Sequence, residues 1–305
     1  MPIINLPDLG RPIIEINEEI LCTRRDPPPI LYHYTNREGL FGILRNQNLW
    51  AKDYRFLGDD KEIEWGHDLI RGVLTSKRKD VLGFRGQGES YRVIELFNTI
   101  ETSLERARRQ VPNHFVTCFS EKGDDLKLWQ EHVGDRGGYS LGFDARILDS
   151  CGSTGVRLLH VKYQESVQVQ ALDRVIERAI KRARSMSDVD DRHWVNLAPL
   201  LADTLMCDLI DCLCSFKRPC FDFEEEWRCV VTPSGIQRVH WEREIKVVAR
   251  SETRYVELRS RTRRLPLLEI IAGPEAKQFD SQLLPQLSVE LKKSQSLVRN
   301  EQWIS

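Results

Sequence analysis

Short runs of β-branched and aromatic residues recur along the chain and predict a strand-rich protein. The first run is Ile30 to Tyr34, which leads into a segment of different periodicity. Comparable runs predict further strands at 114–119, 139–143, 156–163, 227–231, 245–248, 255–258 and 267–271. Strands are therefore expected from the first third of the chain almost to its end.

Other segments carry apolar residues at helical spacing. Leu40 and Ile43 follow Asn36 in this way, so Asn36 is expected to cap a helix. A loop or short helix carrying Trp129 is expected between two strands. Longer helices are predicted at 62–76, 90–109, 169–185 and 194–213. The helices interrupt the strands in no regular alternation, which predicts an α+β fold with a mixed or antiparallel central sheet.

Proline punctuation and composition divide the chain into three parts. Residues 1–28 form an N-terminal extension that ends in a run of prolines, which cannot continue a helix. Residues 29–275 are expected to form one main domain. Residues 276–305 are a polar tail that is expected to be helical.

Composition limits the class of protein. The chain has 305 residues, of which 41% are hydrophobic, so it can bury a core. Its 45 Lys and Arg nearly balance its 46 Asp and Glu, so net charge does not decide for or against nucleic acid. The sequence has neither a membrane-length apolar run nor the features of a signal peptide, which predicts a soluble, cytoplasmic protein. The eight cysteines lack the paired spacing of a zinc site, so we expect no metal.

Three places combine reactive side chains with β-prone surroundings. His33 lies within the first predicted strand, and Ser120 closes the strand at 114–119. Near residue 226, an alternating strand would place Glu224, Glu226 and Arg228 on one face, where the arginine can fix the ionisation of a carboxylate. Each place also has a structural explanation: a partly buried histidine, a turn serine and a strand face with paired charges.

These residues belong to motifs that resemble a bacterial and phage domain family of uncharacterised function. The longest is L-Y-H-Y-T-x-x-E-G-L-x-G-I-L at 31–44. The others are Trp50-Ala-x-Asp53, Leu57-Gly-Asp59-x-x-Glu62, Cys118-Phe-Ser-Glu, Leu128-Trp and Glu224-x-Glu226-x-Arg228, within a similarity that runs from about 30 to 274. The family usually has Asn where this chain has Gly58. It resembles distant ADP-ribosyltransferases, including toxins that modify DNA bases.

The resemblance implies an ADP-ribosyltransferase-like fold, with a split mixed or antiparallel sheet and inserted helices. It implies an NAD-dependent transferase, with NAD as substrate, that acts as a toxin or phage-defence effector. Glu226 would be the catalytic carboxylate, Glu224 would assist it, and His33 would hydrogen-bond a ribose hydroxyl. The NAD-binding residues would be His33, Tyr34, Thr35, Ser120, Trp129 and Arg228.

Two basic clusters bear on the acceptor of the ADP-ribose. They are Arg174, Arg178, Lys181, Arg182 and Arg184 on one predicted helix, and Arg259, Arg261, Arg263 and Arg264 later in the chain. Such clusters can bind phosphates, which favours RNA or DNA over protein as the acceptor. The resemblance also allows a toxin–antitoxin pair, in which an antitoxin protein would restrain the enzyme.

Three alternative functions are considered. One is a non-catalytic nucleotide-binding sensor or interaction module, because a fold alone does not establish activity. Another is a metal-dependent nuclease whose ligands would be Asp53, Asp59, Asp60 and Glu62. A nicotinamide dehydrogenase is disfavoured, because the glycines between residues 83 and 88 have the wrong spacing for a dinucleotide-binding turn.

Overall fold

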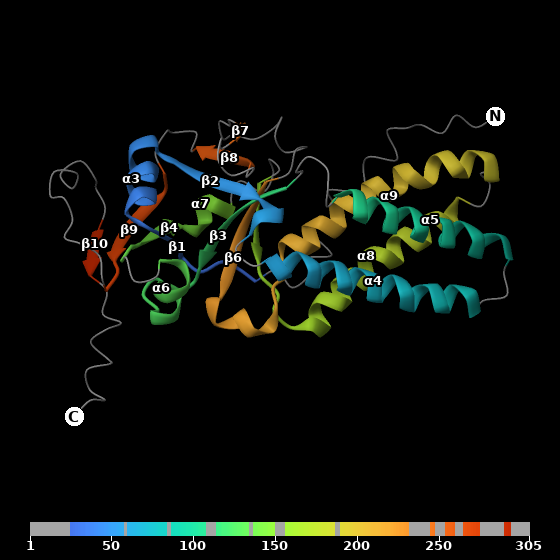
Figure 1. The fold of residues 1–305 in the computed structure, drawn as a ribbon, viewed down its shortest axis with the longest axis horizontal. Helices are drawn as coiled ribbons and strands as arrows, with labels where there is room; N and C mark the ends of the chain where they lie inside the picture. The colour runs from blue at the N-terminus through green and yellow to red at the C-terminus, as the bar shows by residue number, and fades with distance from the viewer. Residues whose placement is uncertain are drawn as a thin grey trace, which may run out of the picture. The chain divides into compact units, whose positions relative to one another are not determined.

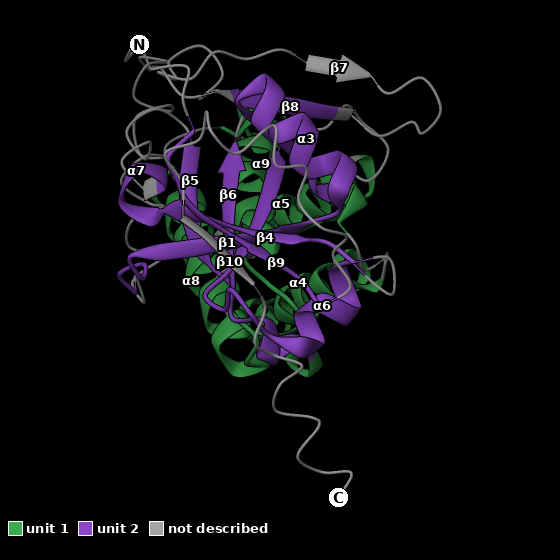
Figure 2. Ribbon diagram, turned by 90° about the vertical axis from the view of Figure 1, so that its left-hand side faces the viewer, with its two compact units in different colours: residues 1–24, 55–112, 162–220 green, residues 25–54, 113–161, 221–305 purple. Residues whose placement is uncertain are grey.

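The chain divides into two compact units, each assembled from segments that are distant in sequence (Figure 2). The computed structural model describes residues 25–57, 60–83, 87–107, 114–133, 137–149, 156–186, 190–231, 245–247, 254–259, 265–274 and 290–293. The helical unit comprises Met1–Arg24, Arg55–Pro112 and Lys162–Cys220, and the sheet unit comprises Arg25–Tyr54, Asn113–Val161 and Phe221–Ser305. The main domain expected at 29–275 thus contains segments of both compact units.

The helical unit contains four long helices (Figure 1). They are α4 (Asp60–Gly83), α5 (Gln87–Ala107), α8 (Glu165–Ser185) and α9 (Asp191–Cys214). The sequence predicts all four, although each begins or ends a few residues from its expected bounds. Helix α8 turns a stripe of apolar residues inward, including Leu172, Val175 and Ile176. Asp190 caps α9, because its side chain accepts a hydrogen bond of 2.9 Å from the backbone N–H of His193.

The sheet unit is built on a large, mostly antiparallel sheet. Its strands among the described residues are β1 (Ile30–Thr35), β2 (Asn48–Asp53), β3 (Phe115–Ser120), β4 (Tyr139–Asp144), β5 (Val156–His160), β6 (Glu226–Val231), β7 (Ile245–Val247), β8 (Arg254–Arg259), β9 (Leu267–Ala272) and β10 (Glu290–Lys293). The order along the sheet is β10-β9-β4-β1-β3-β2-β8-β7, while β6 pairs with both β3 and β5. Among the strand pairs of the described residues, only β9 and β10 run parallel. The expected α+β class with a mixed or antiparallel sheet is confirmed.

Short helices connect several of these strands. They are α3 (Arg37–Asn46), α6 (Leu126–His132), α7 (Ala145–Asp149) and the 3-10 helices η1 (Tyr54–Phe56) and η4 (Pro219–Glu224). The expected cap of α3 is confirmed, since the Asn36 side chain accepts a hydrogen bond of 2.8 Å from the backbone N–H of Gly39. Trp129 lies on a short helix, α6, where the sequence predicted either a loop or a short helix.

Two elements differ from the sequence prediction. Strand β2 was not expected, because Asn48, Lys52 and Asp53 weaken its β-prone character; its pairing with β8 and β3 supplies what local propensity lacks. The helical tail expected at 276–305 is wrong at Glu290–Lys293, which forms β10 alongside β9. The rest of that tail and residues 1–24 of the extension lie outside the described residues.

The core of the sheet unit lies on one face of the sheet. Leu31 on β1 is registered with Phe143 on β4, and Leu141 is registered with Ile270 on β9. All four are fully buried. Because successive side chains of a strand alternate, the residues between them, such as Tyr32 and Gly142, point to the other face. Among the described residues, no helix has the length and apolarity that crossing a membrane requires.

Candidate functional site

The sheet divides between β1 and β3. The two strands share one registered pair, Tyr32 with Ser120. Beyond it, β1 continues against β4 as far as Thr35, whereas β3 continues against β6. His33 is therefore the first residue of β1 past the division.

The imidazole of His33 spans this division. Its Nδ1 lies 2.9 Å from the carbonyl oxygen of Cys118 on β3. A carbonyl oxygen only accepts hydrogen bonds, so Nδ1 must carry the proton and Nε2 must present a lone pair. No other described residue is hydrogen-bonded to the ring. Nε2 is thus an acceptor that a ligand hydroxyl can use.

Burial of the ring lowers the pKa of His33 below its ordinary value of 6.5. The hydrogen bond to Cys118 opposes this shift, and the positive charges of His132 and Lys52 add to it. The side chain is therefore neutral at pH 7, which keeps Nε2 free of a proton. A histidine in this state can accept a hydrogen bond from a sugar hydroxyl or remove a proton.

A polar row crosses the sheet next to His33. Ser120 is registered with Glu226 on β6 and with Tyr32 on β1. Tyr32 is in turn registered with Gly142 on β4, and Gly142 with Glu269 on β9. Registered partners point to the same face, so this row lies opposite the apolar core. His33, one residue after Tyr32, is not part of it.

Tyr32 and Glu269 form one end of the row. The tyrosine hydroxyl donates a hydrogen bond of 2.6 Å to the Glu269 carboxylate, and burial together with this carboxylate raises the tyrosine pKa. Two glycines leave room for the pair. A Cβ on Gly142 would stand 2.7 Å from Cγ of Glu269, and one on Gly123 would stand 2.4 Å from the ring of Tyr32.

Glu226 and Arg228 form the other end. They are two residues apart on β6, so both point to the same face, as the sequence predicts. Nε of Arg228 donates to one carboxylate oxygen at 2.9 Å, and a terminal nitrogen donates to the other at 3.1 Å. The side chains are 5% and 1% exposed. This two-point contact fixes the carboxylate and supplies the opposite charge that a buried anion needs.

The expectation that Glu224 shares a strand face with Glu226 is wrong. Glu224 ends the 3-10 helix η4, and strand β6 begins only at Glu226. Glu225 between them has a φ of 44°, a left-handed conformation that breaks the strand alternation. Glu224 is buried, and its backbone carbonyl accepts a hydrogen bond of 2.6 Å from the hydroxyl of Ser120.

Three of the expected NAD-binding residues support the structure around the division. The Ser120 hydroxyl also accepts a hydrogen bond of 3.0 Å from the backbone N–H of Lys122. The Tyr34 hydroxyl donates to the Lys122 carbonyl at 2.9 Å and accepts from the backbone N–H of Asp125 at 3.2 Å. The rings of Tyr34 and Trp129 meet edge to face at 4.7 Å, and Trp129 is buried. These groups hold α6 and the loop after β3 against β1.

Thr35 ends β1, opposite Tyr139. If position 39 held any residue larger than glycine, its Cβ would stand only 2.0 Å from the Thr35 hydroxyl oxygen. Gly39 therefore allows α3 to begin directly after the strand.

One polar contact was not expected from the sequence. Glu121 follows Ser120 and accepts hydrogen bonds from two sources: the guanidinium of Arg25, at 2.9 and 3.0 Å, and the indole N–H of Trp227, at 2.8 Å. Glu121 is the last residue of the Cys118-Phe-Ser-Glu motif. Its contact with Arg25 could not be predicted from the motif, because Arg25 lies 96 residues away in sequence.

The residues of the alternative nuclease site belong to different compact units or lie outside the described residues. Asp53 is buried in the sheet unit, whereas Glu62 belongs to the helical unit. Gly58, Asp59 and the side chain of Asp60 lie outside the described residues. Within the part of the chain that is described, no group of three or more His, Cys, Asp or Glu side chains is arranged to hold a metal ion.

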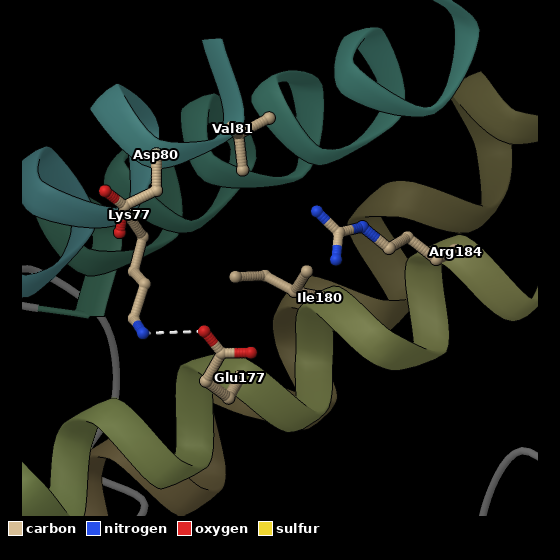
Figure 3. Close-up of a pocket in the computed structure, with 6 residues that line it drawn as sticks. All are labelled: Lys77, Asp80, Val81, Glu177, Ile180 and Arg184. Carbon is tan, nitrogen blue, oxygen red and sulfur yellow. Dashed lines mark hydrogen bonds and ion pairs between the residues drawn. The ribbon is translucent and has the colours of Figure 1, made fainter. Parts of the chain in front are cut away.

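The first basic cluster lies on α8, where Arg174, Lys181 and Arg184 are exposed. The side chain of Arg259 and the rest of the second cluster lie outside the described residues. A cavity of about 160 Å³ lies between α4 and α8 in the helical unit (Figure 3). Lys77, on its rim, forms an ion pair of 2.6 Å with Glu177. The cavity is smaller than the several hundred Å³ that a bound nucleotide needs.

Comparison with models of protein families, with curated proteins and with solved structures finds no match to this chain.

Proposed function

We propose that the chain is an NAD-dependent ADP-ribosyltransferase whose site lies where β1 and β3 divide. The observation that carries the proposal is the state of His33. Its proton is held on Nδ1 by the Cys118 carbonyl, and its Nε2 is left as an acceptor at the division between β1 and β3. The divided sheet is also the arrangement that the resemblance to ADP-ribosyltransferases implies.

In this proposal His33 and Glu226 act on the ribose that carries nicotinamide. Nε2 of His33 accepts a hydrogen bond from a ribose hydroxyl. The bond between ribose and nicotinamide then breaks, and nicotinamide leaves with the bonding electrons. The sugar carbon becomes an oxocarbenium-like cation, which the Glu226 carboxylate stabilises. A nucleophile of the acceptor forms the new bond to that carbon and loses a proton.

The spacing of the strands supports a shared site. The backbones of β1 and β6 are separated by β3 alone, so His33 and Glu226 stand about two strand spacings, roughly 10 Å, apart across the sheet. The side chain of His33 starts from the opposite side of β1 to the polar row. Its ring spans the division to the Cys118 carbonyl and lies against the core residue Phe119, with ring centroids 5.9 Å apart. NAD would therefore enter at the division and meet Glu226 from there.

The acceptor in this proposal is nucleic acid, and the biological role is that of a toxin or phage-defence effector. The acceptor rests on the exposed cations of α8. The role rests on the resemblance of the motifs.

The test uses NAD labelled on the adenylate part, incubated with the full chain and separate pools of RNA, DNA and protein. Nicotinamide release is measured in the same reactions. Transfer of label to RNA or DNA together with nicotinamide release is the expected result. Release without transfer to any pool would show NAD hydrolysis alone. Neither release nor transfer in any pool would refute the proposal.

A second candidate keeps NAD binding without catalysis. It is favoured by the Glu226 carboxylate, both oxygens of which are engaged by a fully buried Arg228. A carboxylate held in this way is well suited to stabilise the fold. Calorimetry separates the two functions: NAD binding without nicotinamide release would favour the binding module.

A further inference from the structure

A large aromatic side chain is exposed on the sheet unit near the candidate site. Trp50 on β2 is 49% exposed, although Tyr255 on β8 supports its ring. The two rings are stacked, with centroids 4.2 Å apart and planes within 17° of parallel. Tyr255 is buried, so it holds the indole in place from below. A rigid, exposed aromatic ring of this kind offers a flat surface to a ligand.

A cation lies on the same face. Lys52 is two residues after Trp50 on β2 and is registered with Tyr255. It is exposed and has no ion-pair partner among the described residues. Glu257, registered with Trp50, is only 2% exposed, so its carboxylate is withdrawn from solvent. The accessible surface thus combines one flat ring with one free positive charge.

The same lysine connects this surface to the division of the sheet. Lys52 is registered with Val116 on β3, two residues before Cys118, whose carbonyl oxygen lies 2.9 Å from Nδ1 of His33. Its positive charge is one of the smaller causes of the lowered pKa of His33.

We propose that Trp50 and Lys52 bind single-stranded nucleic acid, with a base stacked on the indole and a neighbouring phosphate at the ammonium. Stacking on an aromatic ring is open to any base because every base has a flat face, and the lysine adds the charge that the backbone requires. In a duplex both faces of a base are covered by its neighbours, so the ring selects unpaired strands. That the single-stranded nucleic acid accepts ADP-ribose rests on the proposed function. Its binding to Trp50 and Lys52 does not.

The adenosine part of NAD also presents a base followed by phosphate. The experiment must therefore distinguish binding of NAD from binding of a single-stranded nucleic acid at Trp50 and Lys52. Binding of a fluorescently labelled single-stranded oligonucleotide of about 12 nucleotides is measured by anisotropy in the absence of NAD. The Michaelis constant for NAD is measured separately. Trp50→Ala, Trp50→Phe and Lys52→Ala are compared with the wild type.

Trp50→Ala should weaken oligonucleotide binding by about fivefold to 150-fold, the equivalent of about 1–3 kcal/mol for one stacked base. Trp50→Phe should retain part of the affinity because a smaller ring still stacks. Lys52→Ala should make binding less sensitive to salt, with the slope of log affinity against log salt reduced by about 0.7 for one phosphate of a single strand. Duplex DNA of the same sequence should bind more weakly than the single strand.

Tyr91→Ala and Lys79→Ala are the matched controls. They remove an exposed aromatic residue and an exposed lysine from the helical unit, and both should bind the oligonucleotide like the wild type. Thermal unfolding of each variant shows whether it is folded. Wild-type oligonucleotide affinity in folded Trp50→Ala would overturn the inference. So would a raised Michaelis constant for NAD with unchanged oligonucleotide affinity, which would assign the ring to adenine. Oligonucleotide binding by the wild type without any release of nicotinamide from NAD would refute only the proposed function.

Discussion

Replacing Glu226 tests both the stability and the catalytic role of its contact with Arg228. In Glu226→Gln the side chain keeps its shape and loses its charge, so the 1% exposed Arg228 loses the charge of this carboxylate. Removing one partner of a buried ion pair costs about 3–5 kcal/mol. The sheet unit should therefore be destabilised by about that amount. This means that lost activity in Glu226→Gln alone could reflect either chemistry or unfolding.

The magnitude can be measured in a double-mutant cycle with Arg228→Met. Each single variant should lose about 3–5 kcal/mol of unfolding free energy, because each removes one charge of a buried ion pair and keeps the other buried. The double variant should be more stable than either, since no buried charge remains. With a denaturant slope of about 2 kcal/mol per molar, the urea midpoint of each single variant should fall by about 1.5–2.5 M. Circular dichroism follows the transition. Single substitutions that cost less than about 1 kcal/mol and simply add would refute the assigned role of the pair.

The double variant is also the cleanest test of catalysis. It should be folded and should lack the carboxylate, so nicotinamide release should fall by about a hundredfold or more. Near-normal turnover in a folded double variant would reject Glu226 as the catalytic group and would leave the pair with a structural role.

Three further predictions follow from neighbouring residues. His33→Ala should lower kcat/KM for NAD by about two- to tenfold with little change in melting temperature, as expected for one hydrogen bond; unchanged kinetics would make His33 structural. The folded pKa of His33 lies below 6.5, so its contributions to activity and stability should be complete at pH 7 and be lost only as pH falls below 6.5, which pH profiles of kcat/KM and unfolding will show. Tyr32→Phe removes one hydrogen-bond donor to buried Glu269 and should lower the unfolding free energy by about 1–3 kcal/mol, whereas an unchanged thermal midpoint would mean that this hydrogen bond does not stabilise the fold.

The elements that could be predicted from the sequence are those whose signal is local. The side chain of Asn36 caps α3 within three residues, and the strand runs near 115, 139 and 227 are strongly β-prone. Strand β2 could not be predicted in the same way, because it depends on pairing with β8, about 200 residues later. The division of residues 29–275 into two units likewise depends on which helices pack together.

The site shows the same limit. The pairing of Glu226 with Arg228 follows from a spacing of two on one strand and was expected. The left-handed backbone at Glu225 carries no signal in a run of three glutamates, so Glu224 was placed on the wrong element. The bond between Tyr32 and Glu269 joins residues 237 apart, which no local pattern can indicate. The tautomer of His33 depends on the position of the Cys118 carbonyl, which lies 85 residues away in sequence.

The order of segments in the two units has a consequence for how the protein can be dissected. Arg55–Pro112 leaves the sheet after β2 and returns at β3, and Lys162–Cys220 leaves after β5 and returns at β6. In each case the flanking strands are antiparallel partners: Asp53 faces Phe115, and His160 faces Trp227. Both excursions thus occupy the place of a hairpin turn, which two residues such as Asn-Gly can fill. A shorter continuous chain made in this way would contain every described strand of the sheet unit, and it would show whether the site works without the helices.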